Sequence, residues 1–574
     1  MIRINKSSLF YLLLTNFLLG IGVFYLLGAQ FKEIGFHSDD YGLIRHGAVT
    51  SLHDIKRIFK NGDIMHSSCF SSENLYPYGR PSCMEVIYRP LLLLIMGAEH
   101  RIFGLNPYAT HLIHIGLHTL LALTLFNLLF YFFSSIPLAM LGSLFFAFHT
   151  SLKDYFFWQC YIQKSLEGFF FLLLVGFLYL FLKTSHHRWG LSSGVILFLS
   201  LLLRETLFIW PLMAAIGWLF ARKTNLLVVP FSTFIRRYLG YTFISLIGYF
   251  SLRCWAYPFS STVQRIGIKP LGTSEGAFTY LRNKFYDVLT YWFDVCGLKW
   301  IPGNNLFLKL ALIATITGTI IYFFIKSNSL QRALFILFSV SIFLSSWPSL
   351  LFFHSSRYLY LPSLFTALLL GLVIHVLCRH SIFIKMVTYS FLTLFIAVQA
   401  YISIKTMESW CRYNYREMTI HQELSRISHT TNKPIIALGT PLGIIRTGSC
   451  SRPIVVGAKK ESSFFHQFSP HTAIGNYLTL GLLFRALLTG SSIELPSLIF
   501  KQAPTGLEIK TRAPANVWFE QEVIASSSVI GETKILDKEN NKITHFSINF
   551  KPSVIHNNLV VGWLHAERKF IPLN

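Results

Sequence analysis

The sequence predicts a polytopic α-helical membrane protein with a small C-terminal domain outside the membrane. Of its 574 residues, 53% are hydrophobic and only 13% are charged, which gives a mean hydropathy of +0.50. A soluble protein of this length has no use for so much apolar surface. Apolar runs of roughly 17–25 residues, long enough to cross a bilayer, recur up to residue 405. Residues 1–405 are therefore predicted to form the transmembrane domain.

About eleven apolar runs, some of them short or tilted, are predicted to be transmembrane helices. They lie near residues 9–29, 109–133, 136–149, 161–182, 190–203, 207–221, 238–256, 306–325, 333–350, 361–378 and 386–404. The first run is too long for the apolar part of a signal peptide, and no clear small-residue cleavage site follows it. It is therefore predicted to be a retained anchor.

The loops between these runs differ in charge. If every run crosses the membrane once, one side receives Lys183, Arg188, Arg222, Lys223, Arg236, Arg237, Lys326, Arg332, Arg379 and Lys385. An excess of basic residues marks cytoplasmic loops, which predicts a cytoplasmic N-terminus and, from the odd count, an outer C-terminus. The net charge of +24 then reflects contact with membrane lipids, not with nucleic acid. The predicted location is a bacterial inner membrane or, in a eukaryote, the endoplasmic reticulum.

Residues 406–574 differ from the rest of the chain in composition. Apolar runs become shorter, and Pro, Ser, Thr and Asn become more frequent. Alternating apolar and polar residues after Pro434, from His545 and after Asn558 are typical of strands. A helix is expected over residues 473–488. This part is predicted to be a small extracytoplasmic α/β or β-rich domain.

Acidic residues occur at the predicted outer face. Asp39 and Asp40 follow the first apolar run, in an outer loop over residues 30–108, and Asp154 follows the third run. Charge at the edge of a bilayer is costly unless water, a partner or a substrate stabilises it. A solvated loop or a helix cap is the alternative reading of the Asp-Asp pair.

Histidines also occur near the predicted outer face. His111, His114 and His118 are spaced by three and four residues, which places them on one side of a helix. This spacing allows a metal site, but no carboxylate lies within the same turns, so inter-helix hydrogen bonds or pocket lining are favoured over a metal. His149 ends the third run. The metal is left undetermined, with a divalent cation as one option.

Three arginines also lie at or near the predicted outer face. Arg89 precedes Pro90, which suits the first position of a helix, and its side chain either binds substrate or reaches lipid headgroups. Arg204-Glu205 interrupts an apolar run and, taken alone, is expected to be a local ion pair at a tight turn. Arg357 lies at the outer mouth of the tenth run.

In this order, the motifs resemble the GT-C class of membrane glycosyltransferases, and in particular the protein O-mannosyltransferase-like group that includes transmembrane TPR proteins. The matching residues are Asp39-Asp40, Arg89-Pro90-Leu91, His149 with Asp154, Arg204-Glu205-Thr206, and Arg357-Tyr358-Leu-Tyr360-Leu-Pro362-Ser363. The match covers roughly residues 30–365. Thr150 replaces the proline usual after the histidine, Asp154 replaces a glutamate, and no TPR repeats follow.

The resemblance implies transfer of a sugar from a polyprenyl-phosphate donor to a protein, lipid or glycan acceptor, with inversion at the sugar carbon. Such a reaction needs a base for the acceptor hydroxyl and stabilisation of the departing phosphate. Asp40 is the expected base, with Asp39 in support and Asp154 as a further catalytic acid. Substrate binding is expected from Arg89, His111, His114, His149, Arg204, Glu205, Arg357, Tyr358 and Tyr360. Guanidinium groups suit phosphate because they stay charged and bind it through two donors.

Two other classes of protein remain open. A non-catalytic membrane scaffold would keep the fold without needing the acids and Arg357 together. A transporter should show inverted repeats or paired broken helices, and the sequence shows neither.

Overall fold

The computed structural model describes most of the helical part of the chain and nine strands. The described ranges are 6–29, 31, 34, 47, 49–60, 88–104, 106–152, 162–223, 229–256, 295–296, 306–346, 359–379, 382–430 and the strands given below. All structural statements that follow concern these residues.

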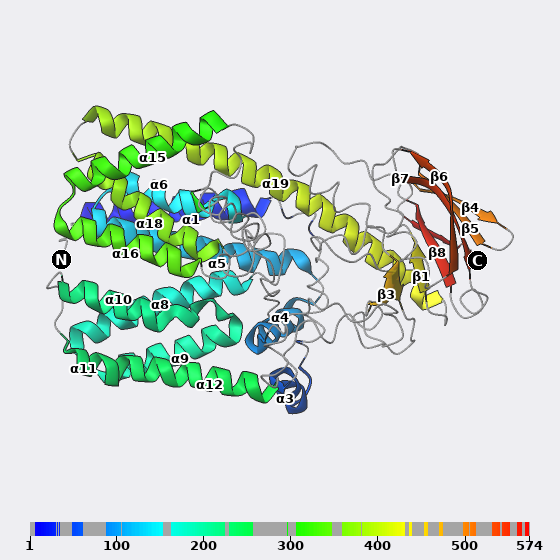
Figure 1. Cartoon of the computed structure of the whole chain (residues 1–574), viewed down its shortest axis with the longest axis horizontal. Helices are drawn as coiled ribbons and strands as arrows, with labels where there is room; N and C mark the ends of the chain where they lie inside the picture. The colour runs from blue at the N-terminus through cyan, green and yellow to red at the C-terminus, as the bar shows by residue number, and fades with distance from the viewer. Residues whose placement is uncertain are drawn as a thin grey trace, which may run out of the picture.

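A helix occupies each of the ranges predicted to cross the membrane. These helices are α1 (Lys6–Gly28), α5 (Pro107–Phe133), α6 (Ile136–Ala147), α8 (Ile162–Thr184), α9 (His187–Leu203), α10 (Trp210–Lys223), α12 (Gly240–Ala256), α15 (Leu306–Lys326), α16 (Ser329–Ser345), α18 (Tyr360–Leu377) and α19 (Ile382–Thr430). Shorter pieces are α3 (Leu52–Lys60), α4 (Pro90–Phe103), η3 (Thr150–Leu152), η5 (Glu205–Ile209), α11 (Phe231–Phe234) and the π-helical η6 (Ile235–Leu239). The long helices lie side by side as a bundle (Figure 1).

Within the described residues, five helical segments are long and apolar enough to cross a membrane. They are Phe10–Gly28, Pro107–Phe133, Ile162–Thr184, Tyr360–Leu377 and Ile382–Lys405. The other apolar helices are shorter, as in α6 and α9. The chain is thus a polytopic helical membrane protein, while the count of about eleven crossings stays a prediction.

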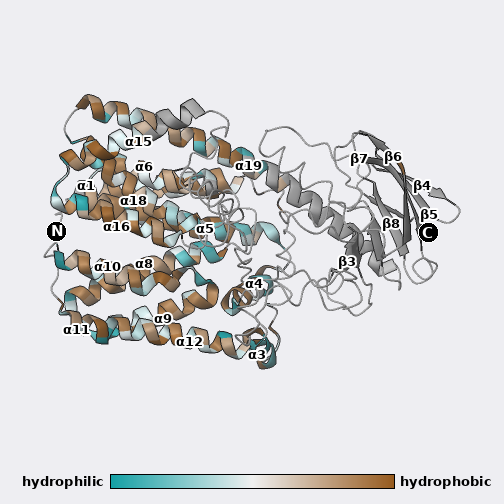
Figure 2. Ribbon diagram, in the orientation of Figure 1, coloured by the Kyte–Doolittle hydropathy of each residue, from teal (hydrophilic) through white to brown (hydrophobic). Residues whose placement is uncertain are grey.

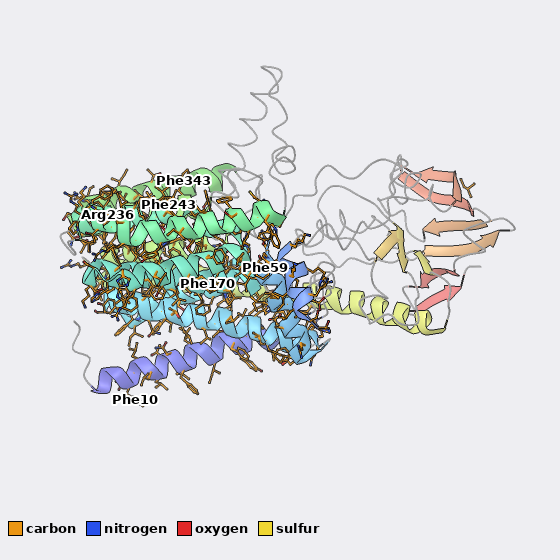
Figure 3. The ribbon with its side chains drawn as sticks, turned by 90° about the horizontal axis from the view of Figure 1, so that it is seen from below. Phe10, Phe59, Phe170, Arg236, Phe243 and Phe343 are labelled. Carbon is orange, nitrogen blue, oxygen red and sulfur yellow. The ribbon has the colours of Figure 1, made fainter. Side chains whose placement is uncertain are left out.

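Hydropathy varies along the bundle as a membrane protein requires. Apolar residues fill the middle of the helices, and hydrophilic residues gather toward their ends (Figure 2). Large apolar side chains such as Phe10 and Phe243 are exposed on the outside of the bundle (Figure 3). In water such exposure would be costly, but lipid tails solvate it. Arg236 lies at the end of the bundle opposite the strands (Figure 3).

Local sequence signals explain several helix ends. Asn106 caps α5 by accepting a hydrogen bond from the Ala109 amide, and Pro107 fills the first helical position. Asn328 and Gln331 form a reciprocal capping box at the start of α16. Pro90 begins α4, as predicted. Ser134 ends α5 in the left-handed conformation, with φ 51°.

Small residues allow α9 to approach its neighbour closely. A Cβ atom on Gly190 would lie 2.0 Å from the Arg237 carbonyl oxygen, and one on Gly194 would lie 3.0 Å from the Tyr241 carbonyl oxygen. Ser245 Oγ donates to the Gly194 carbonyl at 2.6 Å. This is the small-xxx-small packing of membrane helices, and it fixes α12 against α9.

The strands all follow the last helix and form two sheets. They are β1 (Ile435–Leu438), β2 (Pro453–Val456), β3 (Pro470–Ile474), β4 (Leu498–Ala503), β5 (Gly506–Thr511), β6 (Gly531–Glu539), β7 (Lys542–Phe550), β8 (Leu559–Leu564) and β9 (Lys569–Pro572). One sheet has the order β3-β2-β1-β8-β9, in which β1 and β8 are parallel; the other is antiparallel, β4-β5-β7-β6.

Two predictions for this part of the chain need comment. The segments predicted as strands correspond to β1, β7 and β8, but Ala473 and Ile474, predicted to begin a helix, belong to β3 and pair with β2. The boundary placed after residue 405 falls inside α19, which continues to Thr430. The separate outer domain over residues 406–574 therefore stays a proposal.

Candidate functional site

Charged side chains from four helical elements meet at one end of the bundle. The side chains come from the start of α4, the start of α8, the junction of α9 with η5 and the end of α12. This charged cluster consists of Arg89, Gln163, Glu167, Arg204, Glu205 and Arg253. Figure 1 shows α3, α4 and the end of α12 together at the end of the bundle that faces the strands.

Arg89 is held by two side chains. Its Nε and Nη2 atoms both donate to Glu205 Oε2 at 3.3 Å, and Nη1 donates to Gln163 Oε1 at 3.3 Å. Arg89 is the residue immediately before the first turn of α4, and Gln163 lies in the first turn of α8. These contacts fix the plane of the guanidinium group. The structure thus brings together Arg89 and Glu205, both predicted site residues 116 positions apart in sequence.

Glu205 also meets a second arginine. Arg253 Nη1 lies 3.9 Å from Glu205 Oε1 and donates to the Tyr249 hydroxyl at 3.5 Å. Burial would raise the pKa of the Glu205 carboxyl, but the guanidinium groups of Arg89 and Arg253 outweigh this effect and lower its pKa below the usual range. Glu205 is therefore an anion that bridges two cations.

Arg204 points into the bundle interior. Its Nη1 atom lies 3.6 Å from Glu167 Oε2, and both side chains are almost completely buried. The expected local pair between Arg204 and Glu205 is not the main contact of either side chain: Arg204 pairs with Glu167 of α8, whereas Glu205 pairs with Arg89 and Arg253 and receives a smaller electrostatic contribution from Arg204. Backbone geometry explains this: Arg204 is extended, with φ −168° and ψ 142°, and the η5 turn begins immediately after it.

The three histidines of α5 each have a protein partner. Pro107 O accepts from His111 Nδ1 at 2.6 Å, and His114 Nε2 lies 3.2 Å from Glu99 Oε1 of α4. The carboxylate that the local sequence lacks thus comes from a neighbouring helix. His118 Nε2 donates to the Ala147 carbonyl at 3.1 Å. Among the described residues, no group of three or more His, Cys, Asp or Glu side chains is arranged to hold a metal ion.

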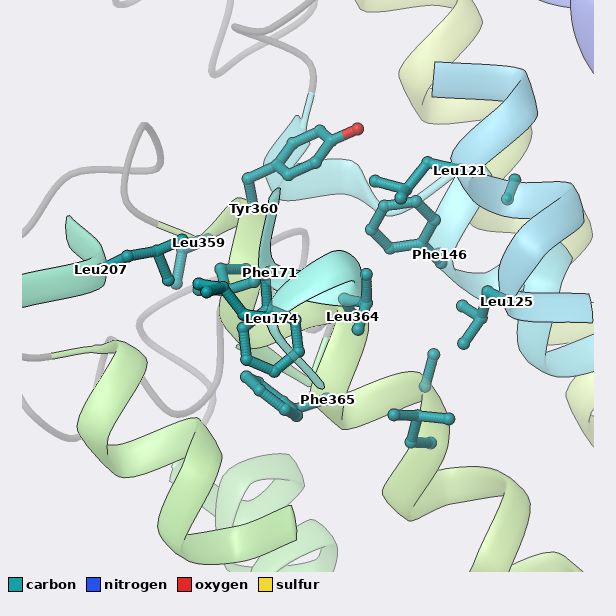
Figure 4. Close-up of a cluster of buried hydrophobic side chains, with 14 of the residues drawn as sticks. Leu121, Leu125, Phe146, Phe171, Leu174, Leu207, Leu359, Tyr360, Leu364 and Phe365 are labelled. Carbon is teal, nitrogen blue, oxygen red and sulfur yellow. The ribbon is translucent and has the colours of Figure 1, made fainter. Parts of the chain in front are cut away.

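Tyr360 belongs to a buried hydrogen-bond chain. In the neutral imidazole whose Nε2 donates to Ala147, His118 Nδ1 accepts, and the Tyr360 hydroxyl donates to it at 2.8 Å. Ser165 Oγ lies 2.9 Å from the same hydroxyl and donates to it. The Tyr360 ring lies beside apolar residues such as Phe146, and its hydroxyl points away from Phe171 and Phe365 (Figure 4). These hydrogen bonds connect α5, α6, α8 and α18.

Tyr360→Phe should therefore act on stability and not on donor use. It removes a hydroxyl that connects two buried polar side chains, which typically costs about 1–3 kcal/mol. Thermal unfolding in detergent should show the loss, while the KM for a donor in a transfer assay stays that of the parent. A raised KM with unchanged unfolding would instead place Tyr360 in contact with substrate.

His149 ends α6 in a buried position. Its Nε2 atom lies 3.0 Å from the Val295 carbonyl oxygen, so at this point it connects α6 to a segment far along the chain. Ser403 Oγ of α19 donates to the Phe148 carbonyl at 3.1 Å, and the Thr150 amide donates to Gln399 Oε1 at 3.3 Å. The α6 end is thus tied directly to the last helix.

The remaining predicted site residues lie outside the described part of the chain. They are Asp39, Asp40, Asp154, Arg357 and Tyr358. Their predicted convergence on one outer cavity stays a prediction.

Sequence reasoning missed Gln163, Glu167 and Arg253. Glu167 gave a signal, since a carboxylate inside a predicted membrane span points to a functional or paired position. Arg253, in the last turn of α12, looked like any basic residue near a helix end. Only the fold shows that it reaches Glu205.

Comparison with known proteins gives a distant structural similarity. No family model and no curated protein matches the chain. Among solved structures, it is similar to the archaeal oligosaccharyltransferase AglB from Archaeoglobus fulgidus, solved with an inhibitory peptide and a dolichol-phosphate. The TM-score is 0.38 at 13% sequence identity, covering 74% of this chain and 59% of the AglB chain. The chain thus spans less than two thirds of that protein, and its function must be argued from its own side chains.

Proposed function

We propose that the protein is a membrane glycosyltransferase of the GT-C type, which moves a sugar from a polyprenyl-phosphate donor to an acceptor at the outer face. The observation that carries the proposal is the bridged pair of arginines at the bundle end, where Glu205 lies between Arg89 and Arg253. Charged side chains cost free energy beside a membrane-spanning bundle, so their presence there points to a functional role. Guanidinium groups beside an apolar bundle fit a ligand that combines a phosphate with a lipid tail.

The expected chemistry assigns the acids of the outer loops to the acceptor side. The Asp40 carboxylate takes the proton of the acceptor hydroxyl while the acceptor oxygen attacks the sugar carbon. Asp39 orients it, and Asp154 contributes a second acid. The bond between the sugar and the phosphate oxygen breaks, and the electron pair leaves with the lipid phosphate. Attack from the face opposite the phosphate gives inversion.

Incubating membranes with labelled polyprenyl-phosphate sugars tests the proposal. We expect label to move from the lipid to a protein, lipid or glycan fraction, and only in membranes that contain the chain. The matched control is Arg236→Gln, which alters an exposed arginine at the other end of the bundle and should not affect transfer. If no donor loses its sugar, while the protein is folded and inserted, a scaffold role becomes the better reading.

The orientation is part of the proposal. With basic loops on the cytoplasmic side, a reporter fused after Thr430 should report the outer compartment, and one fused at the N-terminus should report the cytoplasm. Cysteine-accessibility labelling in intact cells gives an independent measurement. A cytoplasmic reading after Thr430 would place the charged cluster on the wrong side for a lipid-linked donor presented at the outer face.

A further inference from the structure

The three arginines of the charged cluster differ in their acidic partner and in how much of their side chain is exposed. Arg89 and Arg253, which flank Glu205, keep 17% and 22% of their side-chain surface exposed, whereas Arg204, paired with Glu167, keeps only 4%. A ligand arriving at the bundle end can therefore reach the first two guanidinium groups, but it cannot reach the third. Of the two predicted substrate-binding arginines in the cluster, Arg89 is therefore a better candidate for phosphate contact than Arg204.

A pair of tyrosines lies next to the two partly exposed arginines in the chain or in space. The Tyr88 and Tyr249 rings lie 6.1 Å apart between centroids. Tyr88 directly precedes Arg89, is fully buried, and donates its hydroxyl hydrogen to the Phe59 carbonyl of α3 at 3.0 Å. Tyr249 accepts from Arg253. Besides Glu205, Tyr249 thus holds the Arg253 guanidinium and Gln163 holds that of Arg89.

We propose that Arg89 and Arg253 form an oxyanion site for the lipid phosphate, and that Glu205 weakens this site selectively toward the more negative product. The proposal rests on the proposed function. A sugar-carrying polyprenyl phosphate is a phosphodiester with one negative charge. When the bond between sugar and phosphate oxygen breaks, the electron pair stays on the phosphate, and the product is a monoester with nearly two negative charges at pH 8, since its second pKa is about 6.

This change in charge creates a problem for turnover. Two arginines alone would hold the product more strongly than the donor and so would slow its release. A fixed carboxylate between them repels the doubly charged product about twice as strongly as the singly charged donor. Glu205 thus acts as a positioning residue with a second effect, because it balances the affinities for donor and product.

Measuring the binding of lipid phosphates to the purified protein tests the proposed role of Glu205 without requiring catalysis. The probes are polyprenyl monophosphate and its methyl phosphodiester, which stays singly charged. At pH 8, Glu205→Gln should bind the monophosphate about tenfold more tightly, with a smaller change for the diester. At pH 5 the monophosphate is also singly charged, so the difference between the probes should vanish. Weaker binding of both probes would mean that Glu205 only holds the arginines in place and would overturn the proposal.

Arginine variants supply the other half of the test. Arg253→Gln should weaken both probes about tenfold, as expected for a lost charged hydrogen bond, while Arg236→Gln should leave them unchanged. Should Arg253→Gln unfold, Arg253→Lys keeps the charge but loses the planar fork and should weaken binding severalfold. Unchanged binding in a folded Arg253 variant would remove Arg253 from the site.

Two further measurements are decisive. One distinguishes a lipid phosphate from free phosphate as the ligand, and the other distinguishes failure of the oxyanion-site proposal from failure of the proposed glycosyltransferase function. Inorganic phosphate should compete only weakly; competition equal to that of the lipid would identify a free-phosphate site and overturn a lipid role. Binding that follows these expectations in a protein that transfers no sugar would support the oxyanion site and contradict the transferase. Sugar transfer together with unchanged binding in Glu205→Gln and in the folded Arg253 variant would support the transferase and contradict the oxyanion site.

Discussion

Asp40→Asn is expected to lower sugar transfer by ~10²–10⁴-fold, the usual effect of removing a positioned general base. Asparagine keeps the shape and the hydrogen-bonding capacity of the side chain but cannot accept the acceptor proton. Stability should change little, because a neutral amide at a membrane edge is less costly than the charge that it replaces. Single-turnover transfer from a labelled donor, at equal amounts of inserted protein, measures the effect.

The neighbouring acid provides the matched comparison. Asp39→Asn changes the same loop by the same chemistry, and if Asp39 only orients Asp40, the loss should be smaller. Transfer at the parent rate in both variants would reduce the Asp-Asp stretch to a loop and would favour a non-catalytic scaffold. A larger loss in Asp39→Asn would exchange the two roles.

Gly190→Ala is expected to be strongly destabilising, although it adds a single methyl group. The new Cβ would lie 2.0 Å from a backbone carbonyl oxygen, that of Arg237, and neither helix can yield there without shifting as a whole. Overpacking typically costs about 1–3 kcal/mol and sometimes more. Because Arg253 is on α12, which continues from η6, the displacement should also weaken binding at the charged cluster.

The matched control is Gly176→Ala on α8, where the new Cβ would meet nothing within 4 Å. Thermal unfolding in detergent and the yield of monodisperse protein should separate the two variants clearly. Since alanine favours helix over glycine by roughly 1 kcal/mol, the control should be neutral or slightly stabilised. Equal unfolding of both variants would mean that α9 and η6 do not pack as closely as described.

Features set by neighbouring residues could be predicted from the sequence, and features set by helix packing could not. Pro90 begins α4 because a proline suits a first helical turn, which is a local rule. The partner of Glu205 is 116 residues away, and no local pattern says which helices become neighbours. Ala473 and Ile474 were assigned to the wrong element because a short apolar segment fits either a helix or a strand, and pairing with β2 decides it.

Helix α19 extends from the bundle to the strands, where it contacts β9. Its membrane-crossing segment ends at Lys405, yet the helix runs on to Thr430, so a rod of ~37 Å carries the sheets. A rod, unlike a flexible tether, fixes azimuth as well as height, since each added residue lengthens it by ~1.5 Å and turns it by ~100°. Two inserted residues would swing the sheets to the far side, whereas seven would raise them and nearly restore their direction.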